Sequence, residues 1–207
     1  MHIVSFVTQK GGSGKSTLAA SLAVAAQEAG ERVFLLDTDR QGTLARWIDR
    51  REKEEPGFDR VFSSVDLEKA ISTLSQADYS LIIVDTAGAD TPTTAAAIRL
   101  SSFCLVPSRP TPADLEATQP TLEAIQSTRR KFAFVLSQAP TGRSARLTEA
   151  ANALRILGVL AEPPIGQRND HQDAMGTGLG VTEFNPEGKA ADEVRHLWGW
   201  LSKKLKG

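Results

Sequence analysis

The stretch Thr8-Gln9-Lys10-Gly11-Gly12-Ser13-Gly14-Lys15-Ser16-Thr17 decides the fold of this chain. It follows a short apolar run, Ile3–Val7, and leads directly into a segment of helical period, Ser16–Ala29. Glycines at such a junction let backbone N–H groups wrap around an anion without obstruction by side chains. The N-terminus of the helix aims its dipole and its free N–H groups at the same anion. The stretch therefore predicts a phosphate-binding loop between a first strand and a first helix.

The side chains of this loop have separate expected roles. Lys15 supplies a cation to the β- and γ-phosphates of a nucleotide, and the Ser16 hydroxyl can ligate Mg²⁺. The expected nucleotide contacts are Gly11, Gly12, Ser13, Gly14, Lys15, Ser16 and Thr17. The usual pattern begins with a glycine at the position that Gln9 holds here. A glycine-rich turn without a ligand is the alternative, and the strand before it and the helix after it argue against that alternative.

Short apolar runs alternate with segments of helical period along the whole chain. Strands are expected at residues 3–7, 33–36, 79–84, 103–107 and 132–136, with a short one near 159–161. Helices are expected at residues 16–29, 66–76, 93–100, 113–127, 144–157 and 186–204. Short, mostly apolar strands followed by helices are typical of a parallel sheet that is buried on both faces. We therefore predict one α/β domain over residues 1–207, with a doubly wound, mostly parallel sheet and helices on both faces.

Composition and charge exclude several classes of protein. Apolar residues make up 41% of the chain, charged residues 24%, and the net charge is -1, which excludes a protein that coats nucleic acid by bulk positive charge. The single cysteine, Cys104, cannot form an intramolecular disulfide, so a cytoplasmic location is expected. The first residues have no basic leader, and no apolar stretch approaches the ~18 residues that span a bilayer. The charge run Arg50–Glu55 is interpreted as a solvated helix end.

Carboxylates follow two of the expected strands. The ends of parallel strands form the crevice in which ligands bind, and Asp37 and Asp39 face the same side of an extended segment. An isolated Asp-x-Asp could instead cap a helix. The run Leu81–Val84 ends in Asp85, which is the Walker B pattern for a residue that holds Mg²⁺ through water. Gly88 lets its backbone N–H approach the γ-phosphate.

Together these segments resemble the ParA/MinD family of ATPases, whose deviant Walker A motif has a second lysine where Lys10 stands, and within it the small plasmid-type partition ATPases. The resemblance implies ATP and Mg²⁺ as cofactors and a homodimer in the ATP state. In that dimer Lys10 reaches the nucleotide of the partner subunit, Asp37 lies near the magnesium shell with Ser16 and Asp85, and Asp39 orients the attacking water. Lys10, Lys15 and Asp39 are thus the expected catalytic residues. Arg40 replaces a usual proline, so a less rigid loop is expected, and Ala87-Gly88 replaces a pair of prolines.

The resemblance also places an adenine pocket between the end of the fifth strand and a loop after the last strand. Candidates are Ser137, Gln138 and the Pro164–Arg168 loop, and Gln138 and Arg168 are the residues that we select. No Asn-Lys-x-Asp or Thr-Lys-x-Asp segment, whose aspartate reads guanine, follows the fifth strand, so ATP is favoured.

The function that the resemblance implies is that of a weak, partner-stimulated ATPase that segregates a plasmid, a chromosome or another large cargo. A ParB-like or small centromere-binding adaptor and non-specific, nucleoid DNA are its expected partners. Basic residues that could contact DNA phosphates, or that are ordinary solvated charges, are Arg129, Arg130, Lys131, Arg143, Arg146, Lys203, Lys204 and Lys206.

Two other functions remain open. One is a membrane-cycling regulator of the MinD kind, because the final helix carries an apolar stripe at Val194, Leu197, Trp198, Leu201 and Leu205. Packing against the chain's own core is the favoured explanation, because the stripe is no wider than core packing requires, and membrane contact is the less favoured interpretation. The other is a metabolic ligase or reductase on the same fold. A single cysteine argues against an iron–sulfur reductase, and no motif indicates a ligase substrate pocket.

Overall fold

A computed structural model describes residues 1–207, and its seven strands form one sheet. The strands are β1 His2–Phe6, β2 Val33–Asp37, β3 Gly57–Arg60, β4 Leu81–Asp85, β5 Phe103–Ser108, β6 Phe132–Leu136 and β7 Leu160–Ala161. They lie in the order β3-β2-β4-β1-β5-β6-β7, and every neighbouring pair is parallel. All carboxyl ends therefore meet at one edge of the sheet, where ligands bind in open parallel sheets.

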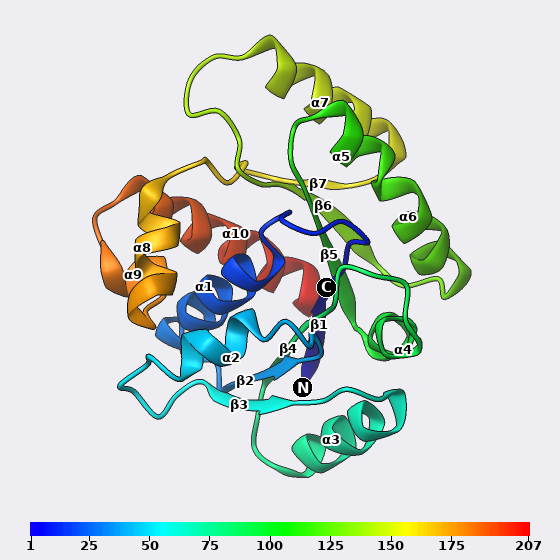
Figure 1. Cartoon of the computed structure of the whole chain (residues 1–207), viewed down its shortest axis with the longest axis vertical. Helices are drawn as coiled ribbons and strands as arrows, with labels where there is room; N and C mark the ends of the chain where they lie inside the picture. Colours follow the sequence, from blue (N-terminus) through cyan, green and yellow to red (C-terminus); the bar gives the residue numbers. More distant parts are fainter.

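The helices cover both faces of this sheet. They are α1 Lys15–Glu28, α2 Thr43–Ile48, α3 Ser64–Gln76, α4 Pro92–Leu100, α5 Pro112–Glu116, α6 Thr118–Ser127, α7 Ala145–Leu157, α8 Asn169–Thr177, α9 Val181–Phe184 and α10 Lys189–Lys206. One face packs against α1, α2, α8, α9 and α10, and the other against α3, α4, α6 and α7 (Figure 1). The predicted doubly wound α/β fold is confirmed. None of the helices is both long and apolar enough to cross a membrane.

The first helix is held firmly in the largest core. Leu18–Ala26 are all buried, so α1 is enclosed almost all round. Such enclosure is expected of a helix that contacts the sheet on one side and other helices on the opposite side. Here α8, α9 and α10 cover the side away from the sheet. This packing places the N-terminus of α1 at the carboxyl edge of the sheet.

The apolar stripe of the final helix belongs to the same core. Val194, Leu197 and Leu201 are fully buried, and Trp198 is 7% exposed. Trp200 meets Phe103 edge-to-face, with ring centroids 6.0 Å apart. Core packing therefore accounts for the stripe, as the sequence analysis favoured.

Some elements differ from the sequence prediction. The single helix expected at residues 113–127 is divided at Ala117 into α5 and α6. Pro120 has no N–H to donate to the carbonyl of Glu116, so a continuous helix would lack a bond there. Strand β3 and helices α2, α8 and α9 were not predicted. They are short, and α8 (Asn-Asp-His-Gln-Asp-Ala-Met-Gly-Thr) has almost no apolar periodicity.

The charge run Arg50–Glu55 follows the end of α2, and five of its six residues are exposed, so its interpretation as a solvated segment holds for every residue except Arg51. α2 ends at Ile48, and the run forms a loop. The Arg51 side chain is only 1% exposed. It bonds both carboxylate oxygens of Glu183, at 2.8 and 2.9 Å, and donates to the carbonyl of Gly178 at 2.9 Å. This bidentate pair ties the loop after α2 to α9.

The Arg51–Glu183 pair predicts a pH-dependent contribution to stability. Burial alone would raise the pKa of Glu183, but hydrogen bonds from Arg51, Lys53 and the N–H of Gly180 lower it to about 2, from an ordinary 4.5. Because the folded pKa lies below the unfolded one, the stabilisation is complete above pH 4.5 and is lost as the pH falls toward 2. Glu183→Gln should therefore lower the free energy of unfolding at pH 7 by about 1–2 kcal/mol.

Urea unfolding of wild type and Glu183→Gln at pH 7 and pH 3 measures this effect, and the gap should narrow at the lower pH. Glu68→Gln is the control, because its pair with Arg99 is half-exposed on the surface and should contribute little. A gap of equal size at both pH values would contradict the assignment.

Candidate functional site

The predicted phosphate loop lies between β1 and α1, at the carboxyl edge of the sheet. Gly12 and Gly14 have φ angles of 75° and 89°, in the left-handed region that favours glycine. The backbone N–H groups of Gly11, Gly12, Ser13 and Gly14 donate to no acceptor in the protein. Polar backbone groups at the N-terminus of a helix that lack internal partners form an anion-binding site.

The end of β6 holds this loop from one side. Ser137 Oγ donates to the carbonyl of Ser13 at 2.7 Å, and Gln138 Nε2 donates to the carbonyl of Gly12 at 2.8 Å. Gln138 itself has a φ angle of 50°, unusual for a residue with a side chain. The carbonyls of the loop are thus engaged by the protein, whereas its N–H groups are left for a ligand.

Lys15 lies within the loop with its charge largely buried. Lys15 is 7% exposed, and its Nζ donates to the carbonyls of Thr8 and Lys10 at 3.4 and 3.3 Å. Burial lowers the pKa of Lys15, while the carboxylates of Asp85 and Asp39 act in the opposite direction. A cation held among carbonyl dipoles at this point is suited to contact phosphate oxygens.

The Lys10 side chain is held by a residue that the sequence analysis missed. Its Nζ lies 3.3 Å from Oδ2 of Asp114, whose side chain is 2% exposed. Asp114 also accepts hydrogen bonds from Arg109 and Thr111, and together with Lys10 these outweigh burial and lower its pKa. Nothing in the sequence spacing links Lys10 to Asp114, because the contact depends on β1 and β5 being neighbours.

Three oxygen-bearing side chains meet where β2 and β4 end. Ser16 Oγ donates to Oδ2 of Asp85 at 2.6 Å, and Asp37 lies opposite Asp85 in the strand register. Asp37 and Asp85 are buried, and Oδ2 of Asp37 and Oδ1 of Asp85 have no hydrogen-bond partner. Burial raises the pKa of both carboxyls, that of Asp85 to about 7. Buried, unpaired carboxylate oxygens beside a hydroxyl fit Mg²⁺, whose charge would offset the free-energy cost of burying two ionised carboxylates.

Asp39 lies at the open end of the same cluster. Its N–H donates to Oδ1 of Asp37 at 2.9 Å, and its own Oδ1 accepts from the N–H of Gln41 at 2.9 Å. These two bonds form a tight turn that holds the Asp39 carboxylate near Lys15 of the phosphate loop. Oδ2 of Asp39 remains free of protein partners.

The residues that depart from the ParA/MinD pattern have partners in the structure. The Arg40 guanidinium lies 5.0 Å from the ring centroid of Phe62, and that of Arg60 lies 4.8 Å from it. Both guanidinium groups thus lie at cation–π distance from one ring. A Cβ on Gly88 would lie 3.3 Å from the backbone nitrogen of Gly11, so the segment after β4 packs directly on the phosphate loop.

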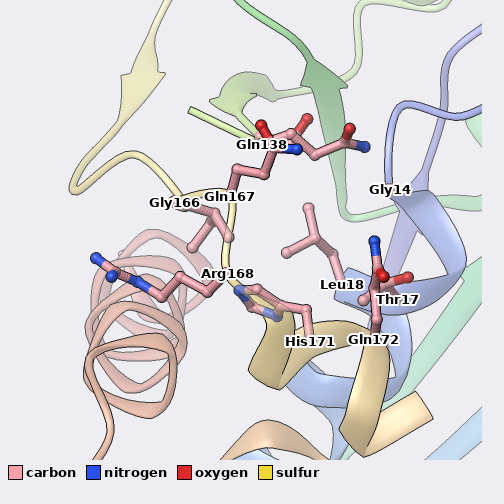
Figure 2. Close-up of a pocket in the computed structure, with 11 residues that line it drawn as sticks. Gly14, Thr17, Leu18, Gln138, Gly166, Gln167, Arg168, His171 and Gln172 are labelled. Atoms are coloured by element: carbon pink, nitrogen blue, oxygen red, sulfur yellow. The ribbon is translucent and has the colours of Figure 1, made fainter. Parts of the chain in front are cut away.

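A pocket of about 140 Å³ adjoins the phosphate loop. Figure 2 shows its lining, which is Gly14, Thr17, Leu18, Ser137, Gln138, Ile165, Gly166, Gln167, Arg168, His171 and Gln172. The structure therefore brings together the segments that the sequence analysis selected for adenine. His171 and Gln172 were missed, because α8 was not predicted and no motif marks them.

The Arg168 side chain lines this pocket only with its stem. Its guanidinium bonds Oε1 of Glu193 at 2.6 Å and is turned toward α10, away from the cavity (Figure 2). Glu193 also accepts from the N–H of Gly166 at 2.9 Å, which fixes the loop that forms the pocket wall. No carboxylate lines the pocket.

The fold and this site define a nucleotide-binding protein of the P-loop class. The sequence model of the CobQ/CobB/MinD/ParA nucleotide binding domain matches residues 4–196, so the chain belongs to that family.

Individual relatives are similar over nearly their whole length. The chain is 30% identical over 197 residues to the Maintenance of carboxysome distribution protein A of Halothiobacillus neapolitanus, covering 91% of this chain and 90% of that protein. It is 31% identical over 208 residues to the protein of the same name from Gloeobacter kilaueensis, covering 99% and 94%. The septum site-determining protein MinD complexed with Mg-ADP from Pyrococcus horikoshii has the same fold, with a TM-score of 0.81, 19% identity, and coverage of 100% of this chain and 97% of that one.

Replacing Lys15 should remove nucleotide binding. Lys15→Ala deletes the buried ammonium group that the phosphate loop encloses, and we expect the affinity for ATP to fall by about 100-fold or more. Titration with a fluorescent ATP analogue measures it, with Lys69→Ala, a substitution of an exposed lysine on α3, as the control. Binding by Lys15→Ala at the wild-type level would remove Lys15 from the site.

Proposed function

We propose that this chain is a Mg²⁺-dependent ATPase that positions DNA or another large cargo by switching between a free state and an ATP-bound homodimer. The observation that carries the proposal is the pair of lysines on one phosphate loop. Lys15 is buried within the loop, whereas the Lys10 side chain is 29% exposed at its mouth and is held by Asp114. A cation placed outside its own phosphate cradle is available to the nucleotide of a second subunit.

The geometry of the loop supports binding of ATP. The N–H groups of Gly11–Gly14 and the Lys15 ammonium hold the β- and γ-phosphates, and Ser16 and Thr17 continue the contacts at the first turn of α1. Ser16, Asp37 and Asp85 are the residues that would hold Mg²⁺, and the bound ion would neutralise charge on the phosphate oxygens. Gln138 and the stem of Arg168 contact the base from the pocket wall.

Hydrolysis requires a positioned water molecule. Asp39 accepts a hydrogen bond from that water through its free Oδ2 and orients it toward the γ-phosphorus. Attack forms a bond from the water oxygen to phosphorus and breaks the bond to the bridging oxygen, which leaves with ADP. Gly88, packed on Gly11, senses the loss of the γ-phosphate through its backbone N–H.

Dimerisation and hydrolysis together give the switch. Two nucleotides that face each other repel through their phosphates, and Lys10 from each subunit offsets this repulsion at a site shielded from water. A ligand shared between subunits stabilises only the dimer, so hydrolysis releases it. A cargo-bound, ParB-like adaptor that stimulates hydrolysis would convert this cycle into movement of the cargo. Relatives named for maintenance of carboxysome distribution support the assignment of positioning.

Non-specific DNA is the proposed track. Arg130, Lys131, Lys203 and Lys204 surround one hollow at the amino ends of β5 and β6, opposite the nucleotide edge. None of these four residues is in a salt bridge within the chain, so their charges are free for DNA phosphates. A dimer presents this basic surface twice, which explains how a nearly neutral chain could bind DNA only with ATP. The burial of the α10 stripe makes a MinD-like membrane cycle the weaker alternative.

Asp39→Ala should separate ATP binding from turnover. The substitution leaves the phosphate contacts in place, so affinity should stay within about 3-fold of wild type while the hydrolysis rate falls by about 100-fold or more. The variant should accumulate as an ATP-bound dimer in light scattering. Phosphate release at the wild-type rate would exclude Asp39 from the mechanism.

Lys10→Ala tests the contact between subunits. The Lys10 side chain pairs with Asp114, and only the backbone carbonyl of Lys10 is bonded to Lys15. ATP binding by the monomer should therefore be nearly unchanged. ATP-dependent dimerisation, hydrolysis and DNA binding should weaken together, each by about 10-fold or more, because all three need the paired state. Sedimentation velocity with and without ATP measures the dimer, with Lys69→Ala as the matched control. An undiminished ATP-dependent dimer in Lys10→Ala would rule out the role.

A further inference from the structure

His171 forms part of the wall of the pocket beside the phosphate loop. It lies on α8, is 8% exposed, and its ring lies near Leu18 and the stem of Arg168 (Figure 2). Neither ring nitrogen has a hydrogen-bond partner, and both are closed to solvent. Buried polar atoms are nearly always paired in folded proteins, because burying an unpaired one destabilises the fold. An imidazole left unpaired at the wall of a ligand pocket therefore indicates a contact that a ligand completes.

The charged groups around His171 are committed to other partners. Glu193 is bonded by Arg168 and by the N–H of Gly166, and Asp170 accepts from Asn185 at 3.0 Å. Burial lowers the pKa of His171, which Glu193 and Asp170 oppose and Arg168 favours. The ring is consequently neutral at pH 7, with one N–H donor and one bare acceptor nitrogen.

The polar groups of the pocket distinguish between purines. Guanine presents two adjacent donors, at N1 and at its 2-amino group, which a carboxylate would receive, and no carboxylate lines this pocket. Adenine presents a 6-amino donor. Ser137 Oγ and Gln138 Nε2 are already engaged by the phosphate loop. A bare imidazole nitrogen is a matching acceptor for a 6-amino group, beside the amide oxygens of Gln138, Gln167 and Gln172, and it is the one left unpaired by burial.

We propose that His171 selects the base of the nucleotide, accepting a hydrogen bond from the 6-amino group of adenine through its unprotonated ring nitrogen. The proposal rests on the ATP site proposed above. Because both nitrogens are closed to solvent in the free protein, the ring turns about its Cβ–Cγ bond as the base enters. That torsion is broad for histidine, so the turn costs little.

The test compares three ligands and two variants. ATP has an amino group at the 6-position of its base, whereas inosine triphosphate has an oxo group there and a proton on N1. Inorganic tripolyphosphate lacks the base and therefore reports on the phosphate loop alone. His171→Phe keeps a flat ring without nitrogens, and His171→Ala serves if the larger ring does not fit. His196→Phe is the matched control, because His196 is exposed on α10 and does not line the pocket.

Dissociation constants from calorimetry give the readout. Wild type should prefer ATP to inosine triphosphate by about 10-fold or more, as one hydrogen bond allows. In His171→Phe that preference should shrink about 10-fold through weaker ATP binding, with tripolyphosphate binding unchanged. The melting temperature without ligand should not fall, since the nitrogens have no partner to lose.

Each contrary result has a separate meaning. If both His171 variants keep the wild-type preference for ATP over inosine triphosphate, His171 does not select the base, and the proposed ATP site stands. An equal loss for all three ligands, with a lower melting temperature, would overturn it in favour of a packing role. Failure of the wild type itself to bind ATP would instead contradict the proposed function.

Discussion

The free backbone N–H groups of Gly11–Gly14 are the constraint on which the rest of the site depends. They can serve an anion only if the loop is held in one shape, and three separate parts of the chain hold it. Ser137 and Gln138 bind its carbonyls, and Gly88 packs on Gly11. The third is α1, which is enclosed in the core and begins where the loop ends. The strand order of the sheet brings these parts of the chain to the same edge.

Buried charges of opposite sign define the electrostatics of this edge. Burial opposes ionisation of Lys15, Asp37 and Asp85 alike. Asp85 and Lys15 lie close enough to offset part of that cost for each other, and Arg60 offsets part of it for Asp37. Unpaired oxygens remain on both aspartates. Such an arrangement is incomplete by itself and becomes favourable when an anion and a divalent cation enter together, which is the composition of a magnesium nucleotide.

The departures from the family pattern are compensated locally. Arg40 stands where the motif that the sequence resembles has proline, and its guanidinium lies over the ring of Phe62, which follows the edge strand β3. Lys10 is not a loose surface lysine, because Asp114 holds it within hydrogen-bonding distance. An ion pair that is partly exposed is weak enough to exchange for another partner, which suits a side chain proposed to act in a second subunit.

The sequence by itself determined the fold class and the phosphate loop. Both are local patterns: the alternation of apolar runs and helices predicts a parallel sheet, and Gly14-Lys15-Ser16 after further glycines, between a strand and a helix, is the pattern of a phosphate loop. Strand ends at Asp37 and Asp85 could be placed together for the same reason, since parallel strands share an edge. Short or polar elements such as β3 and α8 left no such periodic signal.

Only the tertiary structure decided which distant residues meet. It brought Asp114 to Lys10, Glu183 to Arg51, and His171 to the wall of the pocket beside Gln138. It also turned the Arg168 guanidinium toward Glu193 rather than into the pocket. These contacts join residues of different elements, and their geometry depends on strand order and helix packing. Sequence spacing does not contain that information, because chain separation sets no distance once the sheet has formed.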